Sequence, residues 1–520
     1  MSTTDNGGLA QAHAKYLELV RTRDHQAGLA FVRRLKDPAK SPGYYDELRA
    51  AAFTDAGNEL NRTDLLTQGE RLWRGLRSTR PHPVRAYNHA NAMQGLWEMA
   101  SRSPRNLLDA WRDSQEWLRQ ARSAFLDVAR DQEAAPNLAA QCAVNLANSY
   151  DTIGRGIEAV RTYDLALARE PQFAMARGNR GIALLHFSRS AGAHSATVQA
   201  EAYWDLRAAL DQEVNIGSAS AVQSFRKYYE RFKSAPSREL RALPHLSDPY
   251  AAWVQGRELF LHPAPRCVND KTETWDPIFF KGIVRPIAKV TELVPDEVGA
   301  FDVLKNEFAT ARWLAWIATS ETTLSTMLLT AGSRTRYFDT LDYACYDLAS
   351  GIARQAFQAG NNLLDKIASF ICLYLEIRRP RPYFRGWWRK DPTSKSDFSI
   401  HPLVEAELGA KPHNSGFWAL TDLTADFEEG GCYWALQQLR HAATHRMLSL
   451  HEFGSPPSSP LLVHANWGHF EDMLLDQLRV ARAALIYLVQ AVDAREARVK
   501  TGEFAGPLPL EPWRPPPSTS

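Results

Sequence analysis

The chain is poor in cysteine, in long apolar runs and in net charge. Its five cysteines, among 520 residues, include no C-x-x-C pair. We therefore expect reduced, mostly buried thiols rather than a disulfide framework or a zinc knuckle. No stretch approaches the ~18 consecutive apolar residues that can span a bilayer, and the polar start MSTTDNGG does not resemble a secretory signal. These absences predict a cytoplasmic protein that has no membrane contact.

The near balance of charge limits what the protein can bind. Lys and Arg number 61 and Asp and Glu number 59, so the formal net charge is +2. Such a weak field gives little steering, and any contact with nucleic acid has to come from a local patch. The sequence contains no G-x-x-x-x-G-K-[ST] loop, which argues against a nucleotide-binding sensor.

Helical periodicity runs through most of the sequence, and strand-like alternation is scarce. We therefore predict an all-α fold. Because 520 residues exceed one ordinary core, two or three domains are expected. The pattern divides into a disordered start (1–12), TPR-like helical repeats (13–244), a connecting helical domain (245–336), a C-terminal helical bundle (337–500) and a disordered Pro-rich tail (501–520).

One segment, residues 140–171, has the spacing of a tetratricopeptide unit. Small residues at Ala147, Ala159 and Ala166 would let two antiparallel helices approach closely, and Pro171 would stop the second helix. A single repeat cannot bury its own apolar face, so we expect stacked neighbours that offer a surface for a protein or peptide partner. The alternative is an irregular helical domain with one chance match.

Apolar stripes in the C-terminal part predict four helices that pack as an antiparallel bundle. They are expected at residues 337–377, 416–427, 428–448 and 470–500.

The third of these helices, with the sequence CYWALQQLRHAATHR, carries candidate chemistry. Its apolar stripe leaves His441 and His445 on the opposite side and places Arg440 at the border. An Arg followed five residues later by a His is expected by chance in a chain with 15 histidines, and Arg446 with His451 is a second instance. The pair is therefore either an ordinary solvent-facing pair or part of a site.

A metal site is one alternative for two histidines four residues apart. A zincin requires a Glu directly after the first His, and Ala442 stands there instead. His451, His464 and His469 could add ligands, but no thiol or carboxylate lies nearby in the sequence to complete the set. We predict no metal and no cofactor.

The C-terminal bundle resembles a HEPN domain, whose motif is an Arg, a polar residue that is often Asn, a short spacer and a His. The run RHAATH from Arg440 to His445 fits that form, with His441 where Asn is usual. The segments FDVLKNEFATARWLAW, LLDKIASFICLYL and LRHAATHRMLSLHEF are similar to bacterial HEPN proteins that carry TPR-like repeats. The resemblance implies a homodimer that cuts RNA without a metal, as a toxin or effector in bacterial stress or phage defence.

The residue types suit that chemistry. RNA can be cut without a metal when its 2′-hydroxyl attacks the adjacent phosphate. Histidine can take or give the proton, and arginine grips phosphate oxygens. We therefore assign His445 as base or acid, Arg440 as phosphate clamp and His441 as an orienting group. The rival function is a non-catalytic adaptor, whose repeats bind a protein and whose bundle dimerises or binds RNA.

A further pair of charged residues lies in the first predicted helix of the bundle. Asp365 and Lys366 resemble the family pattern, but an ion pair explains them better than catalysis.

The loop IRRPRPYFRGWWRK mixes cations with aromatic residues and could hold RNA. Its predicted RNA-binding residues are Arg378, Arg379, Arg381, Arg385, Trp387, Arg389 and Lys390. The alternative is an Arg-rich helix end whose Trp pair packs into the bundle.

Overall fold

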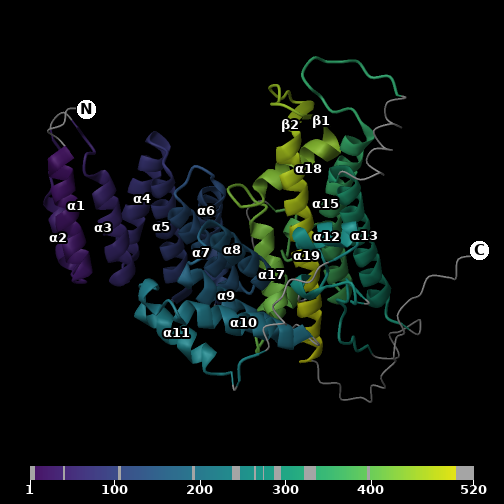
Figure 1. Ribbon diagram of the computed structural model, residues 1–520, viewed down its shortest axis with the longest axis horizontal. Helices are drawn as coiled ribbons and strands as arrows, with labels where there is room; N and C mark the ends of the chain where they lie inside the picture. Colours follow the sequence, from purple (N-terminus) through teal and green to yellow (C-terminus); the bar gives the residue numbers. More distant parts are fainter. Residues whose placement is uncertain are drawn as a thin grey trace, which may run out of the picture.

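The fold is almost entirely helical, as the computed structural model in Figure 1 shows, and the predicted all-α class is confirmed. The structure describes residues 6–498 except 39–40, 103–106, 190–193, 233, 237–245, 263–264, 273, 286–293, 321–334 and 395–398. The predicted tail at 501–520 lies outside this range. Within it, no helix combines the length and apolar character that a membrane crossing needs.

The N-terminal half is a row of helices, each packed on the next along the chain. The first begins at Asn6, earlier than residue 13, where we expected order to start. The row consists of α1 (Asn6–Arg21), α2 (His25–Arg34), α3 (Asp46–Glu59), α4 (Thr63–Thr79), α5 (Pro83–Arg102), α6 (Leu107–Arg130), α7 (Pro136–Ile153), α8 (Gly156–Arg169), α9 (Ala174–Ser188), α10 (Ser195–Leu210) and α11 (Ala219–Tyr229), with a short 3-10 turn at Glu213–Asn215.

The segment with tetratricopeptide spacing forms the pair α7 and α8. Its three small residues, Ala147, Ala159 and Ala166, are completely buried where the helices approach. Between the helices Gly154 has φ +92°, and a Cβ there would lie 3.1 Å from the Cβ of Ser415 in the C-terminal half. The turn thus needs glycine both for its backbone and for its close approach to the bundle. Assignment of the whole row to TPR-like repeats stays a prediction.

The C-terminal half is built around a long buried helix, α19. It packs against α13, α15 and α17, while α18 lies on α15. The elements are α12 (Pro249–Gly256), α13 (Asp296–Thr319), α15 (Leu348–Tyr374), α16 (Pro402–Leu408), α17 (Ser415–Ala425), α18 (Trp434–His445), β1 (Met447–His451), β2 (Leu462–Asn466) and α19 (Trp467–Glu496), with 3-10 turns at Pro265–Cys267 and Phe384–Gly386.

Two of the predicted helices are shorter than expected. The helix predicted at 337–377 begins only at Leu348, where the Asp347 carboxylate accepts a hydrogen bond from the Ser350 amide and caps it. The helix predicted at 428–448 ends at His445, because Arg446 is extended and the next five residues form β1, which pairs in parallel with β2.

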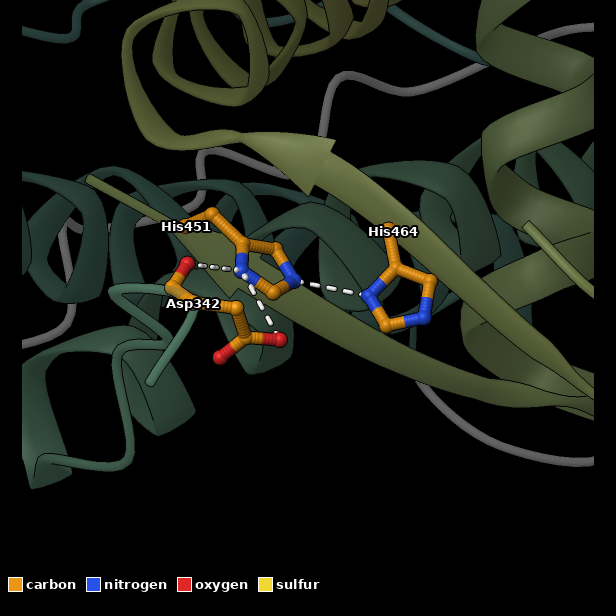
Figure 2. A group of neighbouring side chains, drawn as sticks. All are labelled: Asp342, His451 and His464. Carbon is orange, nitrogen blue, oxygen red and sulfur yellow. Dashed lines mark hydrogen bonds and ion pairs between the residues drawn. The ribbon is translucent and has the colours of Figure 1, made fainter. Parts of the chain in front are cut away.

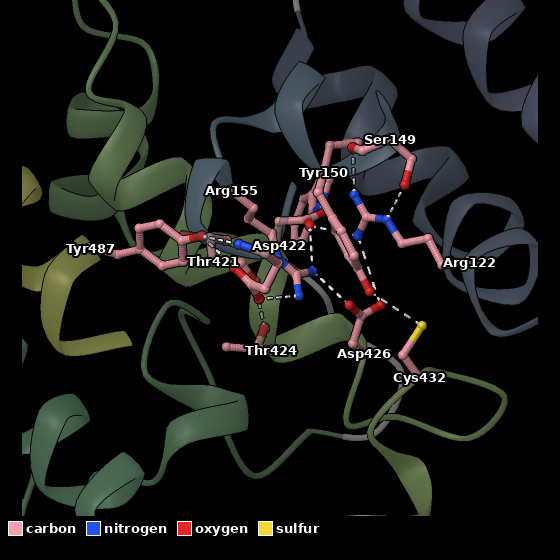
Figure 3. A network of polar contacts seen from close by, with 12 residues as sticks. Arg122, Ser149, Tyr150, Arg155, Thr421, Asp422, Thr424, Asp426, Cys432 and Tyr487 are labelled. Carbon is pink, nitrogen blue, oxygen red and sulfur yellow. Dashed lines mark hydrogen bonds and ion pairs between the residues drawn. The ribbon is translucent and has the colours of Figure 1, made fainter. Parts of the chain in front are cut away.

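A buried polar network joins the helical row to the bundle (Figure 3). Arg122 and Arg155 come from the row, and Asp422 and Asp426 come from α17 and its end. A guanidinium nitrogen of Arg122 lies 2.6 Å from a carboxylate oxygen of Asp422, and one of Arg155 lies 2.6 Å from Asp426. All four side chains are at most 1% exposed. The Asp422 carboxylate also accepts a hydrogen bond from the Trp111 indole at 3.0 Å. Charges that are buried this deeply are stable only with their partners, so the two halves form one folded unit.

Candidate functional site

The predicted motif lies on the last turns of α18. Leu436, Leu439 and Ala442 of this helix are buried against the bundle. Helical periodicity then turns His441 and His445 outward, and both are exposed. Their ring centroids lie 5.1 Å apart. The structure therefore brings the two imidazoles together on one open face.

Arg440 lies at the edge of this face and is held by α15. Its guanidinium forms an ion pair with the Asp365 carboxylate, and the two side chains are 29% and 25% exposed. The second Asp365 oxygen accepts a hydrogen bond from the Phe384 amide at 2.8 Å. Asp365 therefore orients the guanidinium and ties it to the following loop. Its neighbour Lys366 pairs with Glu307 on α13 instead.

Two more α15 side chains contact the end of the motif helix and the strand that follows it. Gln358 donates to the Ala443 carbonyl at 2.6 Å, and Arg354 donates to the Leu448 carbonyl at 2.7 Å. Gln358 follows Arg354 by four positions, and Asp365 follows Gln358 by seven. This helical spacing places all three side chains on one face of α15. Gln358 thereby satisfies a carbonyl of the last turn of α18, which has no intrahelical donor, and Arg354 binds a carbonyl of β1. Sequence reasoning missed this polar stripe, whose signal is the helical spacing of the three residues.

The comparisons with known proteins bear on this part of the chain. Residues 289–495 match the family model of the LA2681-like HEPN domain. The C-terminal half thus carries a HEPN domain. The match begins within the segment that we assigned to a connecting domain, so α13 lies inside the matched region. No curated protein and no solved structure matches the chain.

Part of the predicted RNA-binding loop of the HEPN domain is buried. Trp387 is 0% exposed and presents no ring face on which a base could stack, which corrects its assignment. Arg379 donates to the main-chain carbonyls of Gly386 and Trp387, and it therefore holds the loop together. The alternative of a Trp pair packed into the bundle describes these residues better.

The remaining cations of the loop divide into two groups. Arg385 and Arg389 lie 3.2 Å and 3.6 Å from the carboxylate oxygens of Glu428. Arg378, Arg381 and Lys390 are exposed. This second group is the more exposed of the two, and neither Arg385 nor Arg389 is as open because both lie beside Glu428. The second group is therefore the part of the loop best placed to meet a phosphate backbone.

An apolar surface patch adjoins the end of α18. It is formed by the segment before α15 and by the residues around β1 and β2, and Leu341 within it is 86% exposed. Tyr343 packs edge-on against Phe453, and the Met447 amide donates to the Leu461 carbonyl, which connects the segments. Its exposed members are Tyr337, Phe338, Leu341, Tyr343, Tyr346, Met447, Phe453 and Leu461. Exposed apolar residues gathered in this way are typical of surfaces that contact another molecule.

Proposed function

We propose that the HEPN domain cleaves RNA without a metal ion, through attack of a 2′-hydroxyl on the adjacent phosphate. The observation that carries the proposal is the pair of exposed imidazoles beside an arginine that Asp365 orients. Imidazoles can move protons near neutral pH, and a guanidinium stabilises a phosphate that gains charge. The match to a HEPN model supports an RNA-related role for this region.

The residues take distinct roles in this reaction. His445, at the open end of α18, accepts the 2′-hydroxyl proton or protonates the leaving 5′-oxygen. Arg440 binds the non-bridging phosphate oxygens. His441 helps to orient Arg440 and His445. The new bond joins the 2′-oxygen to phosphorus as the bond to the 5′-oxygen breaks. The products are therefore a 2′,3′-cyclic phosphate and a 5′-hydroxyl end.

A second copy of the chain would complete the site. One motif supplies a single clamp and one histidine pair, whereas in-line cleavage needs both a base and an acid on opposite sides of the phosphate. The apolar surface patch includes Met447, two residues after His445. A two-fold dimer through this patch would place two motifs in one cleft. The proposed setting of such a nuclease is bacterial stress or phage defence, with the helical row as sensor or scaffold.

Incubating the purified full chain with labelled RNA and a chelator tests this proposal. We expect cleavage that the chelator does not reduce, and 3′ ends that only become phosphatase-sensitive after acid opens the cyclic phosphate. If RNA stays intact while the protein still dimerises, the adaptor function is the better description. Cleavage that requires added metal contradicts the proposed mechanism.

The exposed cations of the loop should contribute to RNA affinity through counterion release. Replacing Arg378, Arg381 and Lys390 together with alanine should make the negative slope of log affinity against log salt shallower by roughly 2, at about 0.7 per phosphate contact on single strands. Fluorescence anisotropy with a labelled single-stranded RNA at several salt concentrations measures the slope.

A matched control removes three exposed cations of the helical row, Arg34, Lys36 and Lys227. This variant has the same net charge as the first, so it separates a local contact from a general electrostatic effect. An equal change of slope in both variants would show that the loop has no special part in RNA binding.

A further inference from the structure

Three segments of the chain meet beyond the end of α18. The stretch before α15 bridges to β1, where the Cys345 amide donates to the Leu450 carbonyl at 2.7 Å and the Glu452 amide donates to the Tyr343 carbonyl at 2.9 Å. On its other side β1 pairs with β2, with Ser449 opposite His464. Asp342, His451 and His464, one residue from each segment, come together there (Figure 2).

The hydrogen bonds of His451 fix which ring nitrogen carries its proton. The His451 side chain is 0% exposed, and its Nδ1 lies 2.9 Å from the main-chain oxygen of Asp342. A carbonyl oxygen can only accept, so Nδ1 donates and Nε2 presents a lone pair. That lone pair faces Nδ1 of His464 at 2.7 Å. A ring whose Nδ1 donates to a carbonyl while its Nε2 keeps an unprotonated lone pair has the arrangement of a metal-ligating histidine.

The carboxylate of Asp342 completes a set of three donors. Its Oδ2 lies 3.7 Å from Nδ1 of His451, and one ligand atom from each of the three residues lies within 4.8 Å of the others. Asp342 and His464 are both partly exposed, which leaves a path for an ion and for water.

The backbone around Asp342 is held in a disfavoured conformation. Leu341 and Tyr343, on either side of it, have φ +58° and +59°. Residues with large side chains rarely adopt this left-handed region. The bonds to β1 hold the segment there, and the result is a carboxylate placed next to two imidazoles.

We propose that Asp342, His451 and His464 bind a divalent transition-metal ion of the zinc class, with water as the fourth ligand. Two imidazoles and one carboxylate are a donor set that Zn²⁺ accepts in tetrahedral geometry with an open position. Zinc–nitrogen bonds put two such nitrogens about 3.4 Å apart, so the rings separate by less than 1 Å from their 2.7 Å contact. His464 then carries its proton on Nε2, and the ion replaces the hydrogen bond between the rings.

The ion would fasten the segment before α15 to the strand pair. The ion supplies no group to the chemistry of the proposed RNA cleavage, because neither Arg440 nor the His441–His445 pair belongs to the set. From the sequence we predicted no metal, because Asp342 was not considered as a ligand. It lies 109 positions before His451. A local spacing rule does not include a ligand at that distance.

Titration of the metal-stripped full chain with Co²⁺ tests the site, because tetrahedral cobalt has strong visible absorption bands. We expect one Co²⁺ per chain, displaced by Zn²⁺. Loss of a residue that only supports a metal ligand costs about 10–100-fold in affinity. Asp342→Asn and His464→Ala each remove a ligand itself, so each should weaken Co²⁺ binding on the order of 100-fold. His451 is not replaced, because its buried ring also supports the strand.

Matched controls use histidines outside the set. His469→Ala, close by in the sequence, and the double variant His441→Ala/His445→Ala should bind Co²⁺ as the unmodified protein does. Circular dichroism checks that each variant is folded, and Asp342→Asn keeps the shape of the original side chain. Absence of cobalt bands in the unmodified protein, or unchanged binding by Asp342→Asn, would overturn the proposal.

Discussion

Replacing His445 with alanine should lower the rate of RNA cleavage by a factor of about 10²–10⁴, the usual contribution of a group that transfers a proton in the transition state. The imidazole is exposed at the end of α18, so its removal leaves no cavity in the core. The single-turnover rate with end-labelled RNA measures the effect. A similar loss of RNA affinity would instead point to a role in binding.

Replacing Arg440 with alanine should reduce the rate by about 10²–10³, because a charged donor to the phosphate is lost. Arg440→Lys keeps the charge but not the planar fork, and should recover only part of the rate. Asp365→Asn should give a smaller loss, since Asp365 orients Arg440. The matched control is Arg446→Ala, an exposed arginine that also precedes a histidine by five positions. Unchanged cleavage by both His445→Ala and Arg440→Ala would refute the nuclease proposal.

Replacing Asp422 with alanine should lower the free energy of unfolding by about 3–5 kcal/mol, the usual cost of removing one partner from a buried ion pair. Both Arg122 and Arg155 would lose a carboxylate oxygen that now lies within 3.0 Å. The Trp111 indole would lose its acceptor as well. Urea unfolding followed by tryptophan fluorescence measures the change. Asp64→Ala, which removes an exposed ion pair with Arg62 in the first turn of α4, should cost at most about 1 kcal/mol.

The same carboxylate predicts how stability depends on pH. Burial by itself would raise the pKa of Asp422, but Arg122 and Arg155 outweigh burial and hold this pKa below its ordinary value. A lowered pKa means that the stabilisation is present above the unfolded value of about 3.9 and is lost as the pH falls below it. The difference in stability between the unmodified protein and Asp422→Asn should therefore shrink as the pH falls below about 4. A difference that stays constant over this range would contradict the ion-pair account.

Periodicity was a good guide wherever a helix packs along its whole length. The helix predicted at 470–500 is α19 at Trp467–Glu496, and the one predicted at 416–427 is α17 at Ser415–Ala425. It was wrong after His445, since the apolar residues of β1 are buried by pairing with β2 rather than by a helical stripe. The pairing partner begins at Leu462, beyond the end of the predicted helix, and strand formation depends on such context more than helix formation does.

The candidate site was predictable to a similar degree. Spacing alone placed His441 and His445 on one open face of a helix. The polar stripe of α15 was not foreseen, since Asp365 lies 75 positions before Arg440. Composition also could not say which cations of the basic loop face solvent, because the Glu428 that pairs with Arg385 belongs to a distant segment.

The buried network of Figure 3 limits how this HEPN domain can be combined with other sensor regions. Asp422 and Asp426 belong to the domain, while the cations that neutralise them belong to the helical row. A different N-terminal region could replace the row only if it brought guanidinium groups to the same two positions, or if both aspartates changed with it. Recombination at this junction is therefore constrained by charge, and the two halves are expected to be inherited together.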